Sequence, residues 1–430
     1  MKNKKETLLI LIILITICVI IFNRDKLYEA KYIEPKDTLL AITINGEIST
    51  TFPTTDMYTG TVECTTGTGK VEWNGTKWIL TTSGITKGST KCNAIFKQTL
   101  KQSILANNEV KTPITTPGAA ISTASEVLLA STEDDYGTSY YFRGAVKNNY
   151  VQFANKCWRI VRVSGDGSVK LILHNDNTAK AANPCNSANN SRDAAFARYS
   201  GETYKSKFNS HFNDNAYEGF KYGTPGSSKY EATHANTNKS TILTNLEAWY
   251  DKNNLKDYEK VIADTVWCND KTNVTDTSYN PFTTASEGNA TGLGYGTNKT
   301  YYGATKRLVS ADNKTGGTGP SLKCNGELSK ITSKVGLITA DELALAGYAY
   351  AQKNTTTYLQ ENATDTYWWS LSPSDFNGGI ADVWIVYGSI GYVDYYGVHI
   401  THGLRPSISL KSMTNVTGEG TSSSPYIISM

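Results

Sequence analysis

Six cysteines limit the ways in which this chain can fold. They are Cys64, Cys92, Cys157, Cys185, Cys268 and Cys324, and a seventh, Cys18, stands apart in an apolar N-terminal run. None of the six lies in a C-x-x-C pair and no histidine accompanies them, so we expect disulfides rather than structural zinc. Several connectivities are possible. We favour the sequential pairing, Cys64–Cys92, Cys157–Cys185 and Cys268–Cys324, because each pair then closes within one candidate domain.

The N-terminal segment is typical of an exported protein. Basic residues precede a nearly uninterrupted apolar run from Leu8 to Phe22. We expect this run to be a single-pass membrane anchor with its N-terminus inside and the remaining chain on the extracellular face. A cleaved signal peptide is the alternative, because the run is shorter than the roughly 20 residues of an ideal span. Lipidation at Cys18 is disfavoured because Ile17 stands where a small residue is needed.

Composition indicates a β-rich, loop-rich chain. Its 430 residues suggest two or three domains, and 39% hydrophobic content is enough for real cores. A formal net charge of +3 does not indicate binding to nucleic acid. The 27 tyrosines are in excess, and tyrosine favours strands.

Changes in composition along the chain predict five segments. We assign residues 1–36 to the start, anchor and stalk, 37–108 to a small disulfide-stapled β module with a closing helix, 109–134 to a Thr/Pro/Ser linker, 135–412 to the main domain, and 413–430 to a polar tail. In the β module, Asn74-Gly75 is a tight-turn signal that makes Trp73 and Trp78 cross-strand neighbours.

The main domain reads as antiparallel strands with two helices. Alternating residues between Tyr140 and Leu173 predict a meander. An apolar stripe predicts one helix over Leu243 to Ala263. A capping box of Thr339 and Glu342 predicts that a second helix starts at Ala340. The predicted fold class is therefore α+β.

The stretch from Ser374 to His402 differs from the rest of the chain, because it is rich in Tyr, Asp and Gly, also contains Asn, Ser and His, and lacks Lys, Glu, Gln and Met. Tyr and Trp supply rigid contact area, while Ser, Gly and Asn supply adaptable hydrogen bonding, as in antibody-like binding surfaces. The candidate ligand-binding residues are Asp375, Asn377, Trp384, Tyr387, Tyr392, Asp394, Tyr395, Tyr396 and His399. The alternative is that these tyrosines are ordinary β-sheet residues without a binding role.

Several segments resemble a poorly characterised family of exported proteins of Gram-positive-type bacteria. They include Cys157-Trp158-Arg159-Ile160-Val161-Arg162, Trp267-Cys268-Asn269-Asp270, Gly336-Leu337-Ile338-Thr339-Ala340-Asp341-Glu342, Trp369-Ser370-Leu371-Ser372-Pro373 and Gly403-Leu404-Arg405-Pro406. This family implies no biochemical role. Trp369-Ser370 and Gly403-Leu404-Arg405 also resemble the C-type-lectin fold in its formylglycine-generating-enzyme-like form, which implies a ligand-binding or display scaffold. Catalytic members of that superfamily need paired cysteines near the C-terminal strands, and this chain has no cysteine after Cys324.

Some members of the C-type-lectin fold are targets of diversity-generating retroelements, which mutate adenines in a C-terminal coding window. Asn codons mutated in this way yield the residue types found between Ser374 and His402, except for Trp384. Retroelement diversification of this stretch is therefore a hypothesis that the resemblance raises.

The sequence gives weaker support to a metal site or an enzymatic function. His399 and His402 are three residues apart, which places them on opposite faces of a strand. Asp375, Asp382 and Asp394 could ligate calcium, although no spaced carboxylate motif is present. We expect no cofactor and no enzymatic activity, because no nucleophile motif occurs.

The leading functional hypothesis is a cell-surface recognition or adhesion protein that binds an extracellular protein or glycan. A structural cell-envelope component without a dedicated ligand is the first alternative. A secreted enzyme is the second.

Overall fold

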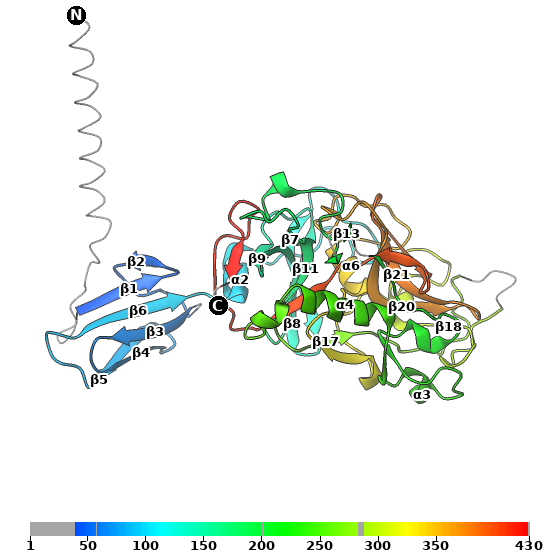
Figure 1. Cartoon of the computed structure of the whole chain (residues 1–430), viewed down its shortest axis with the longest axis horizontal. Helices are drawn as coiled ribbons and strands as arrows, with labels where there is room; N and C mark the ends of the chain where they lie inside the picture. The colour runs from blue at the N-terminus through cyan, green and yellow to red at the C-terminus, as the bar shows by residue number, and fades with distance from the viewer. Residues whose placement is uncertain (1–38, 57, 200–201, 204, 283–287, 429–430) are drawn as a thin grey trace, which may run out of the picture. The chain divides into compact units, whose positions relative to one another are not determined.

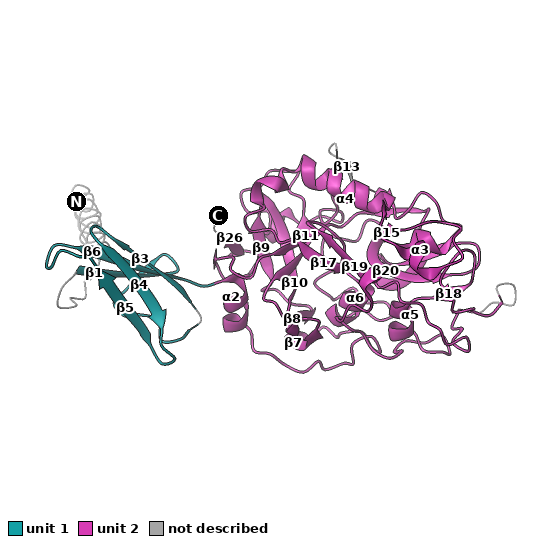
Figure 2. Cartoon of the chain, turned by 90° about the horizontal axis from the view of Figure 1, so that it is seen from below, with its two compact units in different colours: residues 1–98 teal, residues 99–430 magenta. Residues whose placement is uncertain are grey.

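The computed structural model describes residues 39–428 apart from residues 57, 200–201, 204 and 283–287. The chain forms two compact units, Met1–Gln98 and Thr99–Met430 (Figure 2). The boundary precedes the helix that we had assigned to the β module. Leu100 and Ile104 of that helix pack in the large core of the second unit, so the predicted segment 37–108 extends too far.

The first unit is a β structure closed by one disulfide. Strands β1, β2, β3 and β6 form one sheet in the order β2-β1-β6-β3, with β1 and β6 parallel, and β4 and β5 form a hairpin. Trp73 and Trp78 pair across this hairpin, as predicted, and their ring centroids are 5.9 Å apart. The strands are β1 (Leu39–Ile44), β2 (Glu47–Ser49), β3 (Thr59–Cys64), β4 (Thr68–Trp73), β5 (Trp78–Ser83) and β6 (Lys91–Lys97).

The second unit contains two large sheets (Figure 1). One follows the order β24-β11-β10-β9-β26-β25, with β8 pairing β10 and β7 pairing β8. The other follows the order β14-β23-β20-β21-β22, with β18 pairing β20. Their strands are β7 (Val127–Asp134), β8 (Gly137–Gly144), β9 (Tyr150–Phe153), β10 (Lys156–Val163), β11 (Val169–Asn175), β14 (Lys205–Lys207), β18 (Thr300–Tyr301), β20 (Trp368–Phe376), β21 (Ala381–Tyr387), β22 (Tyr392–Gly397), β23 (Thr401–Gly403), β24 (Ser407–Leu410), β25 (Val416–Thr417) and β26 (Tyr426–Ile428).

Three short two-stranded sheets and several helices complete the second unit. The short strands are β12 (Arg198–Tyr199), β13 (Glu202–Thr203), β15 (Lys221–Tyr222), β16 (Asn238–Lys239), β17 (Thr265–Cys268) and β19 (Lys330–Ser333). The α-helices of the described residues are α2 (Leu100–Asn107), α3 (Tyr230–His234), α4 (Thr241–Lys252), α5 (Gly303–Leu308) and α6 (Ala340–Ala346). The 3₁₀ helices are η1 (Ser187–Asn189), η2 (Asn215–Glu218), η3 (Leu255–Tyr258) and η4 (Glu327–Ser329).

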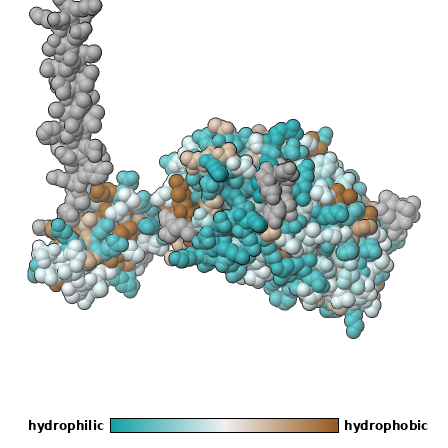
Figure 3. Space-filling model, viewed as in Figure 1, coloured by the Kyte–Doolittle hydropathy of each residue, from teal (hydrophilic) through white to brown (hydrophobic). Residues whose placement is uncertain are grey.

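One continuous core connects the two large sheets. Trp158 of β10, Trp249 of α4 and Trp369 of β20 are fully buried in it. On the face of the molecule seen in Figure 3, hydrophobic residues are scattered among hydrophilic ones. Burial of these tryptophans, together with the aliphatic residues of the same core, contributes apolar stabilisation to this unit.

The predicted fold class is wrong. The chain is mostly sheet, with 36% strand and 14% helix, and a C-type-lectin domain with two helices is not found. The second helix starts at Ala340 with the predicted capping box, in which Thr339 and Glu342 each accept a backbone N–H. However, α3 and α5 are short helices with no side-chain N-cap, so the sequence carried no start signal for them.

The predicted linker and polar tail belong to the second unit. Residues 127–134 form β7, which pairs along its whole length with β8. Glu126 and Arg143 are buried and form an ion pair at 3.0 Å between a carboxyl oxygen and Nε. Tyr426 of β26 is buried, and β26 pairs in parallel with β9. The Thr-, Pro- and Ser-rich composition predicted a linker. Composition alone does not reveal which distant residues a segment contacts.

The predicted membrane-anchored location is also corrected. Within the described residues, no helix is long and apolar enough to cross a membrane. The run from Leu8 to Phe22, on which that prediction was based, lies outside the described residues.

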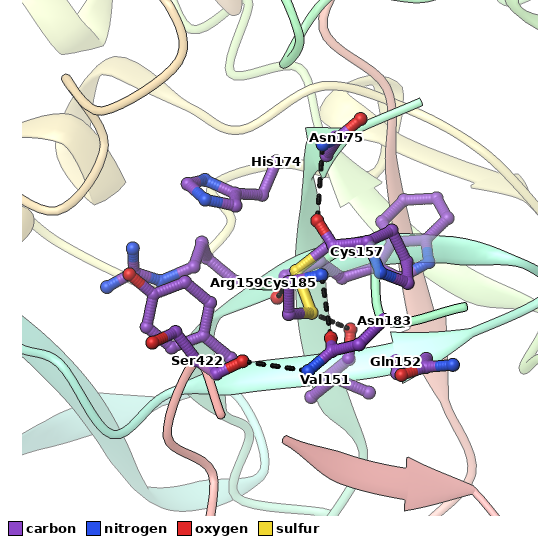
Figure 4. Close-up of a disulfide and its surroundings, with 12 residues drawn as sticks. Val151, Gln152, Cys157, Arg159, His174, Asn175, Asn183, Cys185 and Ser422 are labelled. Carbon is purple, nitrogen blue, oxygen red and sulfur yellow. Dashed lines mark hydrogen bonds between the residues drawn. A yellow bond between two sulfur atoms is a disulfide. The ribbon is translucent and has the colours of Figure 1, made fainter. Parts of the chain in front are cut away.

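The structure confirms the sequential disulfides Cys64–Cys92, Cys157–Cys185 and Cys268–Cys324. Cys157 and Cys185 are fully buried, and the bond ties β10 to the loop after β11 (Figure 4). Asn183 holds that loop, because its side-chain oxygen accepts the Cys185 N–H and its Nδ2 donates to the Ser422 carbonyl (Figure 4). The disulfides are consistent with an oxidising, extracellular environment.

Candidate functional site

The predicted binding stretch, residues 374–402, comprises the end of β20, the antiparallel strands β21 and β22, and the start of β23. In the β21–β22 pair, Tyr387 is opposite Tyr392, Ile385 is opposite Asp394, and Trp384 is opposite Tyr395. Directly paired residues of an antiparallel ladder point to the same face of the sheet, and successive residues point to opposite faces. The pairing register therefore divides the predicted residues between two faces.

One face carries Tyr387, Tyr392, Asp394 and Tyr396, which we call the tyrosine face. Tyr396 is 38% exposed, and the other three are half-buried. The rings of Tyr387 and Tyr392 are 5.6 Å apart. Asp394 lies between Tyr392 and Tyr396 on the same strand, about 7 Å from each along the backbone. These four predicted residues therefore form one surface.

Two further aromatic residues border the tyrosine face, and neither was among the predicted ligand-binding residues. Tyr367 is centred 3.9 Å from Tyr387, and His402 is centred 5.1 Å from Tyr396. His402 is buried, and its Nε2 has no hydrogen-bond partner among the described residues. Tyr367 comes directly before β20 and His402 lies on β23, so only the sheet order β23-β20-β21-β22 could have placed them here.

The charge of Asp394 is not compensated by neighbouring groups. Within the described residues, Asp394 forms no ion pair. Burial raises the pKa of its carboxyl from 3.8 to about 6, and the backbone of Tyr395 lowers it by a smaller amount. Burial and then the Asp394 charge raise the pKa of Tyr387 to about 12. At neutral pH the face therefore presents an ionised carboxylate surrounded by neutral phenols.

The opposite face of these strands is covered. Trp384 is fully buried and Asp375 is 3% exposed. Tyr395 stacks on Phe282, with ring centroids 4.4 Å apart, and Tyr350 packs edge-on against Trp384 at 5.7 Å. Asp375, Trp384 and Tyr395 were predicted to bind a ligand, but Asp375 and Trp384 are buried, and half-buried Tyr395 packs against Phe282. The covering residues come from distant parts of the chain, which the alternating pattern could not reveal.

The two remaining candidates occupy turns. Asn377 accepts the N–H groups of Gly379 and Ile380 and so stabilises the β20–β21 hairpin. His399 follows β22, and its ring lies 4.3 Å from that of Phe212. The structure therefore does not bring Asn377 and His399 together with the tyrosine face.

The acidic residues considered for calcium do not converge. Asp375 pairs with Asp382 on the covered face, whereas Asp394 lies on the tyrosine face. Among the residues that the structure describes, no group of three or more His, Cys, Asp or Glu side chains could hold a metal ion.

A small polar cavity of about 40 Å³ lies beside the Cys268–Cys324 disulfide. Arg162 and Lys170 donate to the same Glu342 oxygen at 2.8 and 2.7 Å. Burial lowers the pKa of Lys170 to about 8, and against the effect of burial Lys170 and Arg162 lower the pKa of Glu342 to about 2. At neutral pH the lowered pKa of Lys170 destabilises the folded protein, whereas the lowered pKa of Glu342 stabilises it. The cavity is filled with paired charges, which indicates a structural role.

Two larger polar cavities have room for a small ligand. One has a volume of about 290 Å³ and the other about 320 Å³. In the first, Asp176 pairs with Lys156, and Asn175 and Asn177 bond to backbone carbonyls. The second is lined by Asn209, Ser210, His211, Tyr222, Lys239, Ser240, Thr241, Thr244 and Asn245. Among the described residues, neither cavity shows a half-buried carboxylate without an ion pair, as the tyrosine face does.

Comparison with known proteins adds no assignment. No protein-family model matches the chain. No curated protein and no solved structure shows significant similarity to it.

Proposed function

We propose that this chain is a recognition protein that binds an extracellular partner through the tyrosine face. The observation that carries the proposal is the half-buried Asp394 carboxylate, which forms no ion pair within the described residues and lies among tyrosines on a rigid sheet. Ionising a desolvated carboxylate without a partner costs stability. Such a cost is typical of binding residues, because a ligand can later compensate the charge.

The tyrosines support the same function. Tyr387, Tyr392 and Tyr396 supply aromatic contact area with few rotatable bonds, so binding loses little side-chain entropy. They belong to adjacent strands that are paired over six residue positions, which keeps their spacing fixed. A structural cell-envelope component would gain nothing from leaving Asp394 unpaired, so the recognition function is favoured over that alternative.

The residue types of this stretch also support a proposal on its variability. If a retroelement diversifies residues 374–402, substitutions at Tyr387, Tyr392, Asp394 and Tyr396 would alter the ligand-facing side chains. Val383 and Ile385 are fully buried, so substitutions there would damage the core. Sequencing the 3′ end of the gene across a population tests this. Adenine-limited differences concentrated at the four surface positions would support diversification, and an invariant stretch would refute it.

Binding is tested with the full-length chain against a panel of extracellular proteins and glycans. The comparison is between wild type, the double variant Tyr392→Ser/Tyr396→Ser, and the control variant Tyr136→Ser. Tyr136 is 57% exposed and lies between β7 and β8, away from the tyrosine face in the sequence. The proposal predicts a panel member that binds wild type and the control but not the double variant. Equal binding by all three proteins would refute it.

A further inference from the structure

The charge distribution of the tyrosine face indicates which ligand group it accepts. Asp394 is the acidic residue of this face, and the rings of Tyr392 and Tyr396 flank it along β22. A cation above the carboxylate would gain an ion pair and would contact the faces of nearby rings. Neutral sugars would stack on the rings and could donate hydroxyl hydrogen bonds to the carboxylate, but they would leave its charge without a counter-ion.

We propose that the tyrosine face binds a lysine or arginine side chain presented by an extracellular protein, with Asp394 as its counter-ion and Tyr387, Tyr392 and Tyr396 around it. This inference rests on the proposed function, because it names the ligand class of the same surface.

The charged and titratable groups around Asp394 are consistent with this ligand. On β23, burial and then Lys205 lower the pKa of His402 to about 4, so His402 is neutral at pH 7 and does not repel a cation. Lys353 forms a bridge to Tyr392 from the segment beside β22, but it is exposed and forms no ion pair with Asp394. Among the residues that the structure describes, the Asp394 carboxylate on the tyrosine face therefore has no counter-ion.

The size of the face favours a side chain of a protein over a small free ligand. Half-buried Tyr367 extends the aromatic surface beyond the carboxylate, with its ring centred 3.9 Å from that of Tyr387. A basic side chain could pair with Asp394 while the backbone and neighbouring residues of its protein contact Tyr367 and the exposed Tyr396. A free amino acid would leave most of that area uncovered.

Three short peptides test this directly. They are acetyl-Gly-Lys-Gly-amide, acetyl-Gly-Arg-Gly-amide and the neutral acetyl-Gly-norleucine-Gly-amide, titrated into the full-length chain with NMR observation of the tyrosine ring signals. We expect the two basic peptides to shift tyrosine signals and the norleucine peptide to have no effect. In Asp394→Asn, affinity for the basic peptides should fall by roughly tenfold. Wild-type affinity should also fall as the pH is lowered through about 6, because the proton competes with the cation.

Two controls separate this inference from the proposed function. Asp312→Asn removes an exposed carboxylate elsewhere in the unit and should leave peptide binding unchanged. A panel ligand that is lost in Tyr392→Ser/Tyr396→Ser but retained in Asp394→Asn would overturn the cation inference and leave the recognition function intact. Equal binding of the basic and norleucine peptides, or panel binding only to neutral glycans, would also overturn it.

Discussion

Replacing Asp394 by asparagine should stabilise the protein at neutral pH. The carboxyl has a folded-state pKa of about 6 and an ordinary value of 3.8. Below pH 3.8 it is protonated in both the folded and unfolded states, so it costs nothing. Between these two values the unfolded state ionises first, and folding loses free energy as the pH rises. Above pH 6 the loss is constant.

The size of the effect follows from the pKa values. Each tenfold change in proton binding is worth about 1.4 kcal/mol, so a rise from 3.8 to about 6 corresponds to about 3 kcal/mol. Part of the carboxylate still contacts water, so this is an upper limit and we expect about 2 kcal/mol. Asparagine has nearly the same shape but cannot ionise, and it should recover this free energy above pH 6.

Urea unfolding of wild type and Asp394→Asn at pH 4 and pH 7 measures the effect. Tryptophan fluorescence is a suitable signal, because six of the eight tryptophans lie in the second unit. The informative quantity is the change in the stability difference between the two pH values, since other effects of the substitution cancel. Asp312→Asn is the control, and it should show no gain because contacts with Lys314 and Ser310 lower the pKa of Asp312. A difference for Asp394→Asn that is independent of pH would show that a neighbour such as Lys353 neutralises the carboxylate, and would refute the reasoning.

Three further perturbations test the interior of the second unit, each by urea unfolding. Glu342→Gln should destabilise the protein by about 3–5 kcal/mol, because it leaves buried Lys170 and half-buried Arg162 without their shared carboxylate. Glu327→Gln, which breaks an exposed pair of similar length, should change little, and equal effects of the two substitutions would contradict this. Glu218→Gln should stabilise the protein at pH 7, because burial and nearby aspartates raise the pKa of fully buried Glu218. The gain should disappear as the pH falls towards 4. A loss of stability at pH 7 would show that the Glu218 carboxylate stabilises the fold. Replacing Cys157 and Cys185 by serine should cost about 3–4 kcal/mol, from the entropy of a loop with a sequence separation of 28 residues, and an unchanged urea midpoint would count against that entropic contribution.

Local signals in the sequence predicted local structure well. The turn at Asn74-Gly75 set the Trp73–Trp78 pair, and the Thr339 capping box set the start of α6. Sequential pairing of the cysteines was also confirmed. These features depend on residues close together in the chain or on simple closure of a loop, so no knowledge of distant partners was needed.

The fold class and the limits of the second unit depended on distant partners. The segment before Tyr136 looked like a linker, yet Glu126 is buried against Arg143 and β7 pairs with β8. The C-terminal residues looked like a polar tail, yet β26 pairs with β9. Composition reports how polar a segment is, but not which buried charge or sheet edge it meets.

The candidate site was predicted in part for the same reason. Alternation in β22 indicated that about half of its tyrosines would face outward, but the register with β21 decided which ones. Tyr395 is covered by Phe282, which lies more than a hundred residues earlier in the chain. Its neighbours Asp394 and Tyr396 remain on the accessible face.

Footprinting of a complex tests the central claim most directly. The full-length chain, with and without the member of the extracellular panel that it binds, is exposed to hydroxyl radicals, and tyrosine oxidation is quantified by mass spectrometry. The account predicts that the ligand protects Tyr392 and Tyr396, whereas Tyr136 is oxidised equally in both samples. Protection at Tyr222, beside the polar cavity of about 320 Å³, with no protection of Tyr392 or Tyr396, would contradict the account and place the binding site elsewhere.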